Sequence, residues 1–153
     1  MITNQEFKRW NTILGWASFL IAFIVYMLTL EPTASWWDCG EYISTAYKLQ
    51  VGHPPGAPTF QLIGRFFSLF AFGDTAHVAK MVNTMSAFSS GLTILFLFWS
   101  ISLLGRKLLV KAEGGYTLNQ VIMLYGSAFV GAMAYTFSDS FWFSAVEGEV
   151  YAM

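Results

Sequence analysis

The sequence has few charged residues and almost no cysteine, and each shortage excludes a class of protein. Charged residues make up 11% of the 153 residues, less than half of the roughly 25% found in soluble domains, so a soluble globular domain describes it poorly. The formal net charge of −1 gives no electrostatic reason to bind nucleic acid. The single cysteine, Cys39, excludes an internal disulfide and a zinc site built from cysteines.

Long uncharged segments are what the sequence has instead. Hydrophobic residues make up 56% of it, and three runs without Asp, Glu, Lys or Arg cover 12–30, 81–104 and 114–138. A bilayer core about 30 Å thick needs roughly 20 mainly apolar residues in a helix. The sequence therefore predicts an all-α chain with three membrane-spanning helices. The first run exceeds the roughly 7–15 apolar residues of a signal peptide, so we expect a retained anchor.

Charged residues at the ends of these runs predict the orientation of the chain. Basic residues precede the first run and recur in the segment 105–113, whereas the residues after the third run are acidic. The positive-inside rule therefore places the N-terminus in the cytoplasm, 31–80 in an external loop, and 139–153 at the start of a second external loop. The basic residues are Lys8, Arg9, Arg106, Lys107 and Lys111, and the acidic ones are Asp139, Glu147 and Glu149.

The external loop 31–80 contains two further helix patterns. Ser35, with an acidic residue three positions later, fits a capping box and predicts a helix over about 36–50 that ends at Gly52. An apolar stretch over 59–72 has Arg65 as its one charge. It is too short to span a bilayer, so we expect an interfacial or re-entrant helix.

Asp38 and Glu41 are the first candidate functional residues. They share the polar face of the helix predicted over 36–50, and one interpretation makes them an ordinary cap and a solvated charge. The alternative is that they are working acids, because carboxylates kept beside a membrane segment are costly and often functional. The neighbouring aromatic residues would then lower local polarity and raise a carboxylate pKa, as a general base requires.

Other polar residues also have two interpretations. His53 is a turn residue, a donor to a phosphate, or a metal ligand together with Asp38 and Glu41. The spacing of these three residues matches no metal motif, so we predict no metal. Arg65 either extends its charge to the interface or binds a lipid phosphate through its guanidinium. Glu147 and Glu149 are either loop residues or share a cleft with Asp38.

Two motifs together resemble a known family. The stretch "WWDCGEYISTAYKLQVGHPPGAPTFQLIGRFFSLF" contains D-x-G-E and H-P-P-G-x-P, and the last five residues, "EVYAM", resemble a second acidic motif. This combination resembles the N-terminal region of the family catalogued as domain of unknown function 2723, from about residue 10 onward. One departure is Gln50-Val51, where Leu-Gly-hydrophobic is more usual. We expect 1–153 to be the N-terminal fragment of one larger membrane domain. The motif residues are Asp38, Gly40, Glu41, Gly52, His53, Pro54, Pro55, Gly56 and Pro58.

The resemblance implies a fold and an activity. The family is similar to the C-type glycosyltransferases, multi-pass helix bundles that use a polyprenyl- or dolichyl-phosphate sugar, and its eukaryotic relatives are protein O-mannosyltransferases. It implies transfer of mannose or a related hexose to a protein hydroxyl or a glycan on the periplasmic or lumenal face, without a further cofactor. By resemblance Asp38 is the base and Glu41 its partner or substitute, while Glu149 and Tyr151 bind substrate. We expect His53 and Arg65 to steady the departing phosphate.

Two other functions stay open from the residues alone. A transporter or flippase-like subunit would bind ions or substrate through intramembrane acids near the bilayer midplane. The candidate acids lie outside the predicted spans, which favours the transferase. A structural subunit would tolerate loss of Asp38. We expect the isolated fragment to be inactive, because most of the bundle that would hold a lipid carrier is missing.

Overall fold

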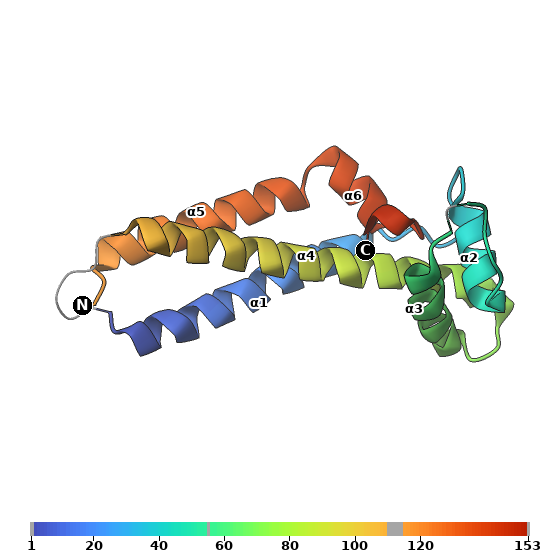
Figure 1. Ribbon diagram of the computed structural model, residues 1–153, viewed down its shortest axis with the longest axis horizontal. Coiled ribbons are helices and arrows are strands. Elements are labelled where there is room, and N and C mark those ends of the chain that lie inside the picture. The colour runs from blue at the N-terminus through green and yellow to red at the C-terminus, as the bar shows by residue number, and fades with distance from the viewer. Residues whose placement is uncertain (1, 55, 110–114, 153) are drawn as a thin grey trace. The chain divides into compact units, whose positions relative to one another are not determined.

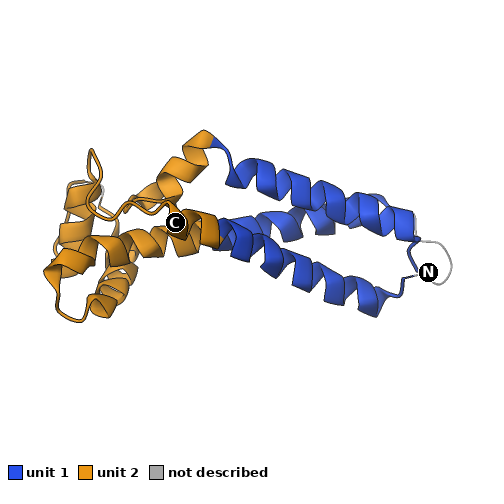
Figure 2. Ribbon diagram, turned by 180° about the vertical axis from the view of Figure 1, so that it is seen from behind, with its two compact units in different colours: residues 1–22, 91–138 blue, residues 23–90, 139–153 orange. Residues whose placement is uncertain are grey.

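The computed structural model describes residues 2–54, 56–109 and 115–152, which are mainly helical and contain no strand. Pro55 of the motif, Lys111, the predicted start of the third span at 114 and Met153 lie outside them. The chain forms two compact units, residues 1–22 with 91–138 and residues 23–90 with 139–153 (Figure 2). The helices are α1 (Asn4–Leu28), α2 (Cys39–Lys48), α3 (Pro58–Ser68), α4 (Val78–Leu108), α5 (Leu118–Thr136) and α6 (Asp139–Ala145), with 3-10 turns η1 (Leu69–Ala71), η2 (Thr75–His77) and η3 (Val150–Ala152) (Figure 1).

Among the described residues, two helical segments are long and apolar enough to cross a membrane. They are α1 and the segment Thr75–Leu108, which joins η2 to α4. The predicted spans 12–30 and 81–104 lie on these two segments, apart from the last two residues of the first. The predicted third span, 114–138, contains α5, which qualifies only if α5 and α6 together form one broken span.

The first unit combines the start of α1, the end of α4 and α5. The Tyr125 hydroxyl of α5 donates to the Phe7 carbonyl of α1 at 2.7 Å, and the Trp99 indole of α4 donates to the Asn11 carbonyl at 3.1 Å. A Cβ added at Gly131 would lie 2.9 Å from the Ile101 side chain, so this glycine lets α5 approach α4 closely. Hydrogen bonds between helices and a small residue at a close contact therefore hold these three segments together.

The second unit packs α2 and α3 against the start of α4. Its core contains apolar side chains from all three helices, and Gly64 of α3 allows close packing because a Cβ there would lie 2.9 Å from the Cβ of Ala46. A core of this kind fixes the direction in which α2 begins, and with it the position of Asp38. The buried core residues are Cys39, Ile43, Ala46, Phe60, Ala71, Val78, Val82 and Met85.

Buried Asn83 of α4 ties the loop after α1 to this core. Its side-chain amide donates to the carbonyls of Glu31 at 2.7 Å and Thr33 at 3.0 Å. The Glu31 backbone N–H in turn donates to the Val146 carbonyl at 3.1 Å, just after α6. The segment that leads to α2 and the segment that follows α6 are thereby held side by side.

The predicted boundaries of α2 were wrong at both ends. The helix begins at Cys39 because Trp37 adopts a left-handed conformation with φ of 60°, and the predicted capping box at Ser35 does not form. It ends at Lys48 because Leu49, rather than Gly52, takes the left-handed conformation that terminates a helix. Asp74, after the apolar stretch, caps η2 by accepting from the Ala76 N–H at 2.9 Å.

Candidate functional site

Asp38 stands at the start of α2 but does not cap it. It is the N-cap residue, yet its side chain makes no capping hydrogen bond; only its carbonyl accepts, from the Tyr42 N–H at 2.9 Å. Capping residues usually have extended backbone angles, whereas Asp38 has φ −81° and ψ −4°. Its carboxylate, with 57% of the side chain exposed, is therefore available for other contacts.

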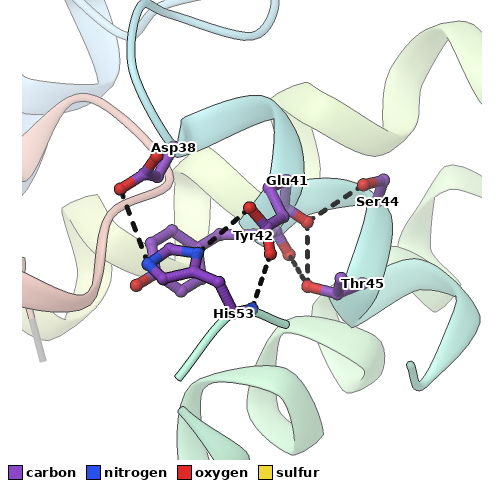
Figure 3. Close-up of polar contacts among 6 residues, drawn as sticks. All are labelled: Asp38, Glu41, Tyr42, Ser44, Thr45 and His53. Atoms are coloured by element: carbon purple, nitrogen blue, oxygen red, sulfur yellow. Dashed lines mark hydrogen bonds and ion pairs between the residues drawn. The ribbon is translucent and has the colours of Figure 1, made fainter. Parts of the chain in front are cut away.

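Glu41, one turn along α2, holds His53 beside Asp38 (Figure 3). One Glu41 oxygen accepts the His53 backbone N–H at 2.7 Å, and the other lies 3.0 Å from the His53 Nδ1. The far side of the ring faces Asp38, with Nε2 3.8 Å from Oδ2. The imidazole thus lies between two carboxylates, and both of its nitrogens donate when the ring is protonated.

The charges of this trio are consistent with an ion pair. The hydrogen bonds from His53, first from its backbone and then from its ring, lower the pKa of Glu41 below its ordinary value. The hydrogen bond to Glu41 and the charges of Glu41 and Asp38 raise the pKa of His53. Both Glu41 oxygens are therefore engaged in fixing His53, and a part for Glu41 in catalysis stays a prediction.

A cavity of about 340 Å³ opens next to Asp38. The segment after α6 supplies two further carboxylates to its wall, and aromatic rings supply most of the remainder. Neither Glu41, His53 nor Arg65 lines it. Its lining residues are Trp37, Asp38, Tyr42, Phe143, Ser144, Glu147, Glu149 and Tyr151.

Acidic groups dominate the polar part of this cavity. Glu147 is only 5% exposed. Burial, followed by the charges of Glu147 and Asp38, raises the pKa of Glu149. The described lining residues include no Lys, Arg or His. Carboxylates accept hydrogen bonds from hydroxyl groups, and a protonated Glu149 can also donate one. The cavity therefore suits a neutral ligand rich in hydroxyls.

Arg65 lies at a separate place in the same unit. Its Nη1 donates to the Tyr47 carbonyl at 2.8 Å, and its guanidinium carbon lies 5.3 Å from the centre of the Tyr47 ring. It lines a cavity of about 240 Å³ with Tyr47, Lys48 and Leu49. Arg65 is thus grouped with another cation, and not with the carboxylates.

The structure brings together some of the predicted site residues and adds others. Asp38, Glu149 and Tyr151 share the cavity, and Glu41 and His53 adjoin it through Asp38. A cleft shared by Asp38, Glu147 and Glu149 was one of the two interpretations that the sequence left open, whereas the sequence did not place Phe143 at all. Trp37 could have been found from the sequence, because it directly precedes the candidate residue Asp38. The position of Phe143 in the cavity depends on long-range packing, which the sequence does not show.

Within the part of the chain that the structure describes, Asp38, Glu41 and His53 form a group that could hold a metal ion. One ligand atom from each lies within 4.8 Å of the others, and carboxylate oxygen with imidazole nitrogen suits several divalent metals. Both Glu41 oxygens are already acceptors for His53, however, and Nδ1 cannot donate a proton and bind a metal at once. The absence of a metal stays a prediction.

A larger cavity lies in the other unit but offers no comparable chemistry. It measures about 560 Å³ and is lined by leucines, Arg106, Lys107 and Tyr116. The Arg106 guanidinium donates to the Tyr116 hydroxyl at 2.7 Å and to the Asn4 side chain at 3.0 Å. No carboxylate is among its described lining residues, so it holds no candidate base.

Comparison with known proteins places these residues in a family. Residues 38–153, which contain both acidic motifs, match the family model described as "Protein O-mannosyl-transferase TMEM260 N-terminal domain". A Dictyostelium discoideum protein named protein O-mannosyl-transferase tmem260 is 27% identical over 135 residues, 88% of this chain and 14% of that protein. A mouse protein named protein O-mannosyl-transferase TMEM260 is 35% identical over 86 residues, 56% of this chain and 12% of that protein.

These findings sharpen the predicted resemblance. The chain spans only about a seventh of the Dictyostelium relative, and no solved structure matches it. The predicted similarity to protein O-mannosyltransferases is supported, whereas the label domain of unknown function 2723 stays a prediction. The match covers three quarters of the sequence and every candidate site residue. The chain therefore belongs to the family described as the protein O-mannosyl-transferase TMEM260 N-terminal domain.

Proposed function

We propose that this chain carries the catalytic base of a membrane glycosyltransferase. The enzyme moves mannose or a related hexose from a polyprenyl-phosphate donor to the hydroxyl of an acceptor protein. The observation that carries the proposal is Asp38, an N-cap residue whose carboxylate leaves the helix end uncapped and lines a cavity with Glu149. The family and the names of the two relatives support the sugar and the protein acceptor.

The proposed reaction is a single inverting displacement. The oxygen of an acceptor serine or threonine attacks the anomeric carbon, and the bond from that carbon to the phosphate oxygen breaks on the opposite face. Asp38 takes the hydroxyl proton, a contribution worth roughly 10²–10⁴ in rate. The phosphate leaves as an anion and needs no proton, which distinguishes the reaction from glycoside hydrolysis with its second, acidic carboxyl group.

The remaining residues are assigned supporting roles. Glu41 fixes His53 through two contacts, and His53 brings a positive charge to within 3.8 Å of the Asp38 carboxylate. That charge helps to steady the departing phosphate. Glu149 and Tyr151, which line the same cavity, contact sugar hydroxyls. Arg65 contacts a lipid phosphate away from the reacting atoms, because it lines a different cavity.

The surroundings of the reaction belong to the same proposal. The cavity faces the periplasm or lumen, the N-terminus faces the cytoplasm, and the complete enzyme is a multi-pass bundle of the C-type kind. The chain spans 14% of the Dictyostelium relative, and the proposed site needs a groove for the polyprenyl tail that the remaining spans would form. We therefore expect the isolated 153 residues to transfer no sugar.

A reconstituted assay separates transfer from transport. The full-length parent is placed in liposomes with a polyprenyl phosphate carrying radiolabelled mannose, and a protein acceptor is enclosed or added outside. The proposal expects label on serine or threonine of the acceptor, released by β-elimination. Movement of the labelled lipid between leaflets without any labelled acceptor would overturn it in favour of a flippase. Label on a glycan alone would replace the protein acceptor.

A further inference from the structure

Trp37 combines a strained backbone with a side chain that packs poorly. Its φ of 60° lies in the left-handed region, where a bulky residue is an outlier and glycine or asparagine is usual. The residue is 91% exposed. Among the described residues, no ring contact involves its indole. The fold therefore gains little from having tryptophan here, and strain of this kind is often kept at functional sites.

The left-handed turn places two neighbouring side chains on one cavity. Along an extended chain, successive side chains point to opposite faces. Trp37 and Asp38 are adjacent in sequence, yet both line the 340 Å³ cavity. Trp36, the residue before, is similarly exposed at 84% but does not line it. The backbone conformation thus directs one of two exposed indoles toward the candidate base.

The chemistry of the cavity indicates what this indole contacts. A hexose ring has hydroxyl groups around its edge and C–H groups on its faces. Glu147 and Glu149 offer acceptors for the hydroxyls, while the electron-rich face of an indole attracts C–H groups that carry partial positive charge. The described lining residues combine several carboxylates with no cation. Binding of an acceptor peptide does not require such a lining, so the cavity fits a sugar better than a peptide.

We propose that Trp37 is the platform on which the hexose of the donor stacks, so that its anomeric carbon is held beside Asp38. This inference rests on the proposed function and adds a binding residue for the sugar. Trp37 directly precedes the candidate base Asp38. We therefore assign it to the donor sugar, which carries the reacting carbon, and not to a more distant part of either substrate. Stacking on an aromatic face requires a ring but not an indole nitrogen, so phenylalanine replaces tryptophan with little loss.

The test measures KM for the donor and kcat separately in the full-length enzyme. Trp37→Ala raises the donor KM about two- to tenfold, the size of one lost aromatic contact, while kcat at saturating donor stays close to wild type. Trp37→Phe restores most of the affinity. Trp36→Ala is the matched control, since it removes a similarly exposed indole that does not line the cavity, and it leaves the donor KM unchanged.

Four results would overturn the inference. They are equal donor KM values for Trp37→Ala and Trp36→Ala, failure of Trp37→Phe to restore the donor KM, a fall in kcat alone, or a parallel loss of membrane insertion in both alanine variants. The last would make the two indoles interfacial anchors. A thermal unfolding scan of each variant identifies a purely structural role. If Asp38→Asn loses transfer while Trp37→Ala keeps the wild-type KM, only this inference fails; if wild type transfers no sugar, the proposed function fails first.

Discussion

Replacing Gly148 by alanine tests whether the placement of the acidic segment after α6 matters. Gly148 lies between the two cavity carboxylates Glu147 and Glu149 but does not itself line the cavity. An added Cβ would lie 2.9 Å from the Asn83 Oδ1 and 3.1 Å from the Ile43 Cγ1. The substitution therefore acts on the position of the two acids without touching a substrate.

The size of the effect follows from these distances. The separation of 2.9 Å falls 0.5 Å short of the 3.4 Å at which ordinary contact begins. Asn83 cannot move freely, because it is fully buried and donates to two carbonyls, and Ile43 belongs to the core. The acidic segment must shift instead. A misplacement of about 1 Å can cost 10²-fold in rate, so half of that predicts roughly a tenfold loss of transfer.

The assay compares transfer and stability in the same membrane preparation. Gly148→Ala should lower kcat about tenfold and reduce the free energy of unfolding by about 1–3 kcal/mol through overpacking. Gly126→Ala is the control, because a Cβ there meets nothing within 4 Å; it should leave transfer unchanged and stability equal or slightly higher. Full activity in a folded Gly148→Ala enzyme would refute the reasoning, since the acids would then need no fixed position.

Three further predictions concern the neighbouring groups. The Glu41–His53 pair contributes to stability above about pH 4.5, the ordinary pKa of Glu41, because the carboxylate is then ionised and its pKa is lowered in the folded chain. This contribution is lost as the pH rises through the raised pKa of His53, because the ring then loses its charge. In a pH–rate profile, Glu41→Gln should therefore move the alkaline limb to lower pH, and an unchanged limb would exclude the pair from the mechanism. Transfer should survive EDTA, because Glu41 already accepts two contacts from His53; loss restored by Mn²⁺ would instead show a metal site. Gly64→Ala, whose Cβ would meet that of Ala46 at 2.9 Å, should lower the free energy of unfolding by about 1–3 kcal/mol in a denaturation series, and unchanged stability would mean that α2 and α3 separate at little cost.

The sequence predicted most of the helices because apolar runs and turn residues are local signals. It failed at the start of α2, where Ser35 fits a capping box. Trp37 instead turns the chain, and no sequence rule expects a bulky residue to be left-handed. Leu49 ends the same helix for a similar reason, since packing of α2 against its neighbours fixes the boundary before the glycine.

The site depended on contacts that no single stretch encodes. Asp38 could be named from its motif, but its place beside Glu149 requires the ties from Asn83 to the loop after α1 and from Glu31 to Val146. The burial of Glu147 is likewise a product of tertiary packing. Local patterns therefore identify the acids, whereas the long-range hydrogen bonds decide which of them share a cavity.

The most direct test of the account is the single-turnover rate of Asp38→Asn in the full-length enzyme with donor already bound. Asparagine keeps the size of the side chain and cannot accept the hydroxyl proton, so the rate should fall by about 10²–10⁴ while donor binding and membrane insertion stay at wild-type levels. Asp139→Asn, an exposed acid at the start of α6 outside the cavity, is the control and should transfer normally. A wild-type rate in folded Asp38→Asn would contradict the account, because the carboxylate would then have no part in proton removal.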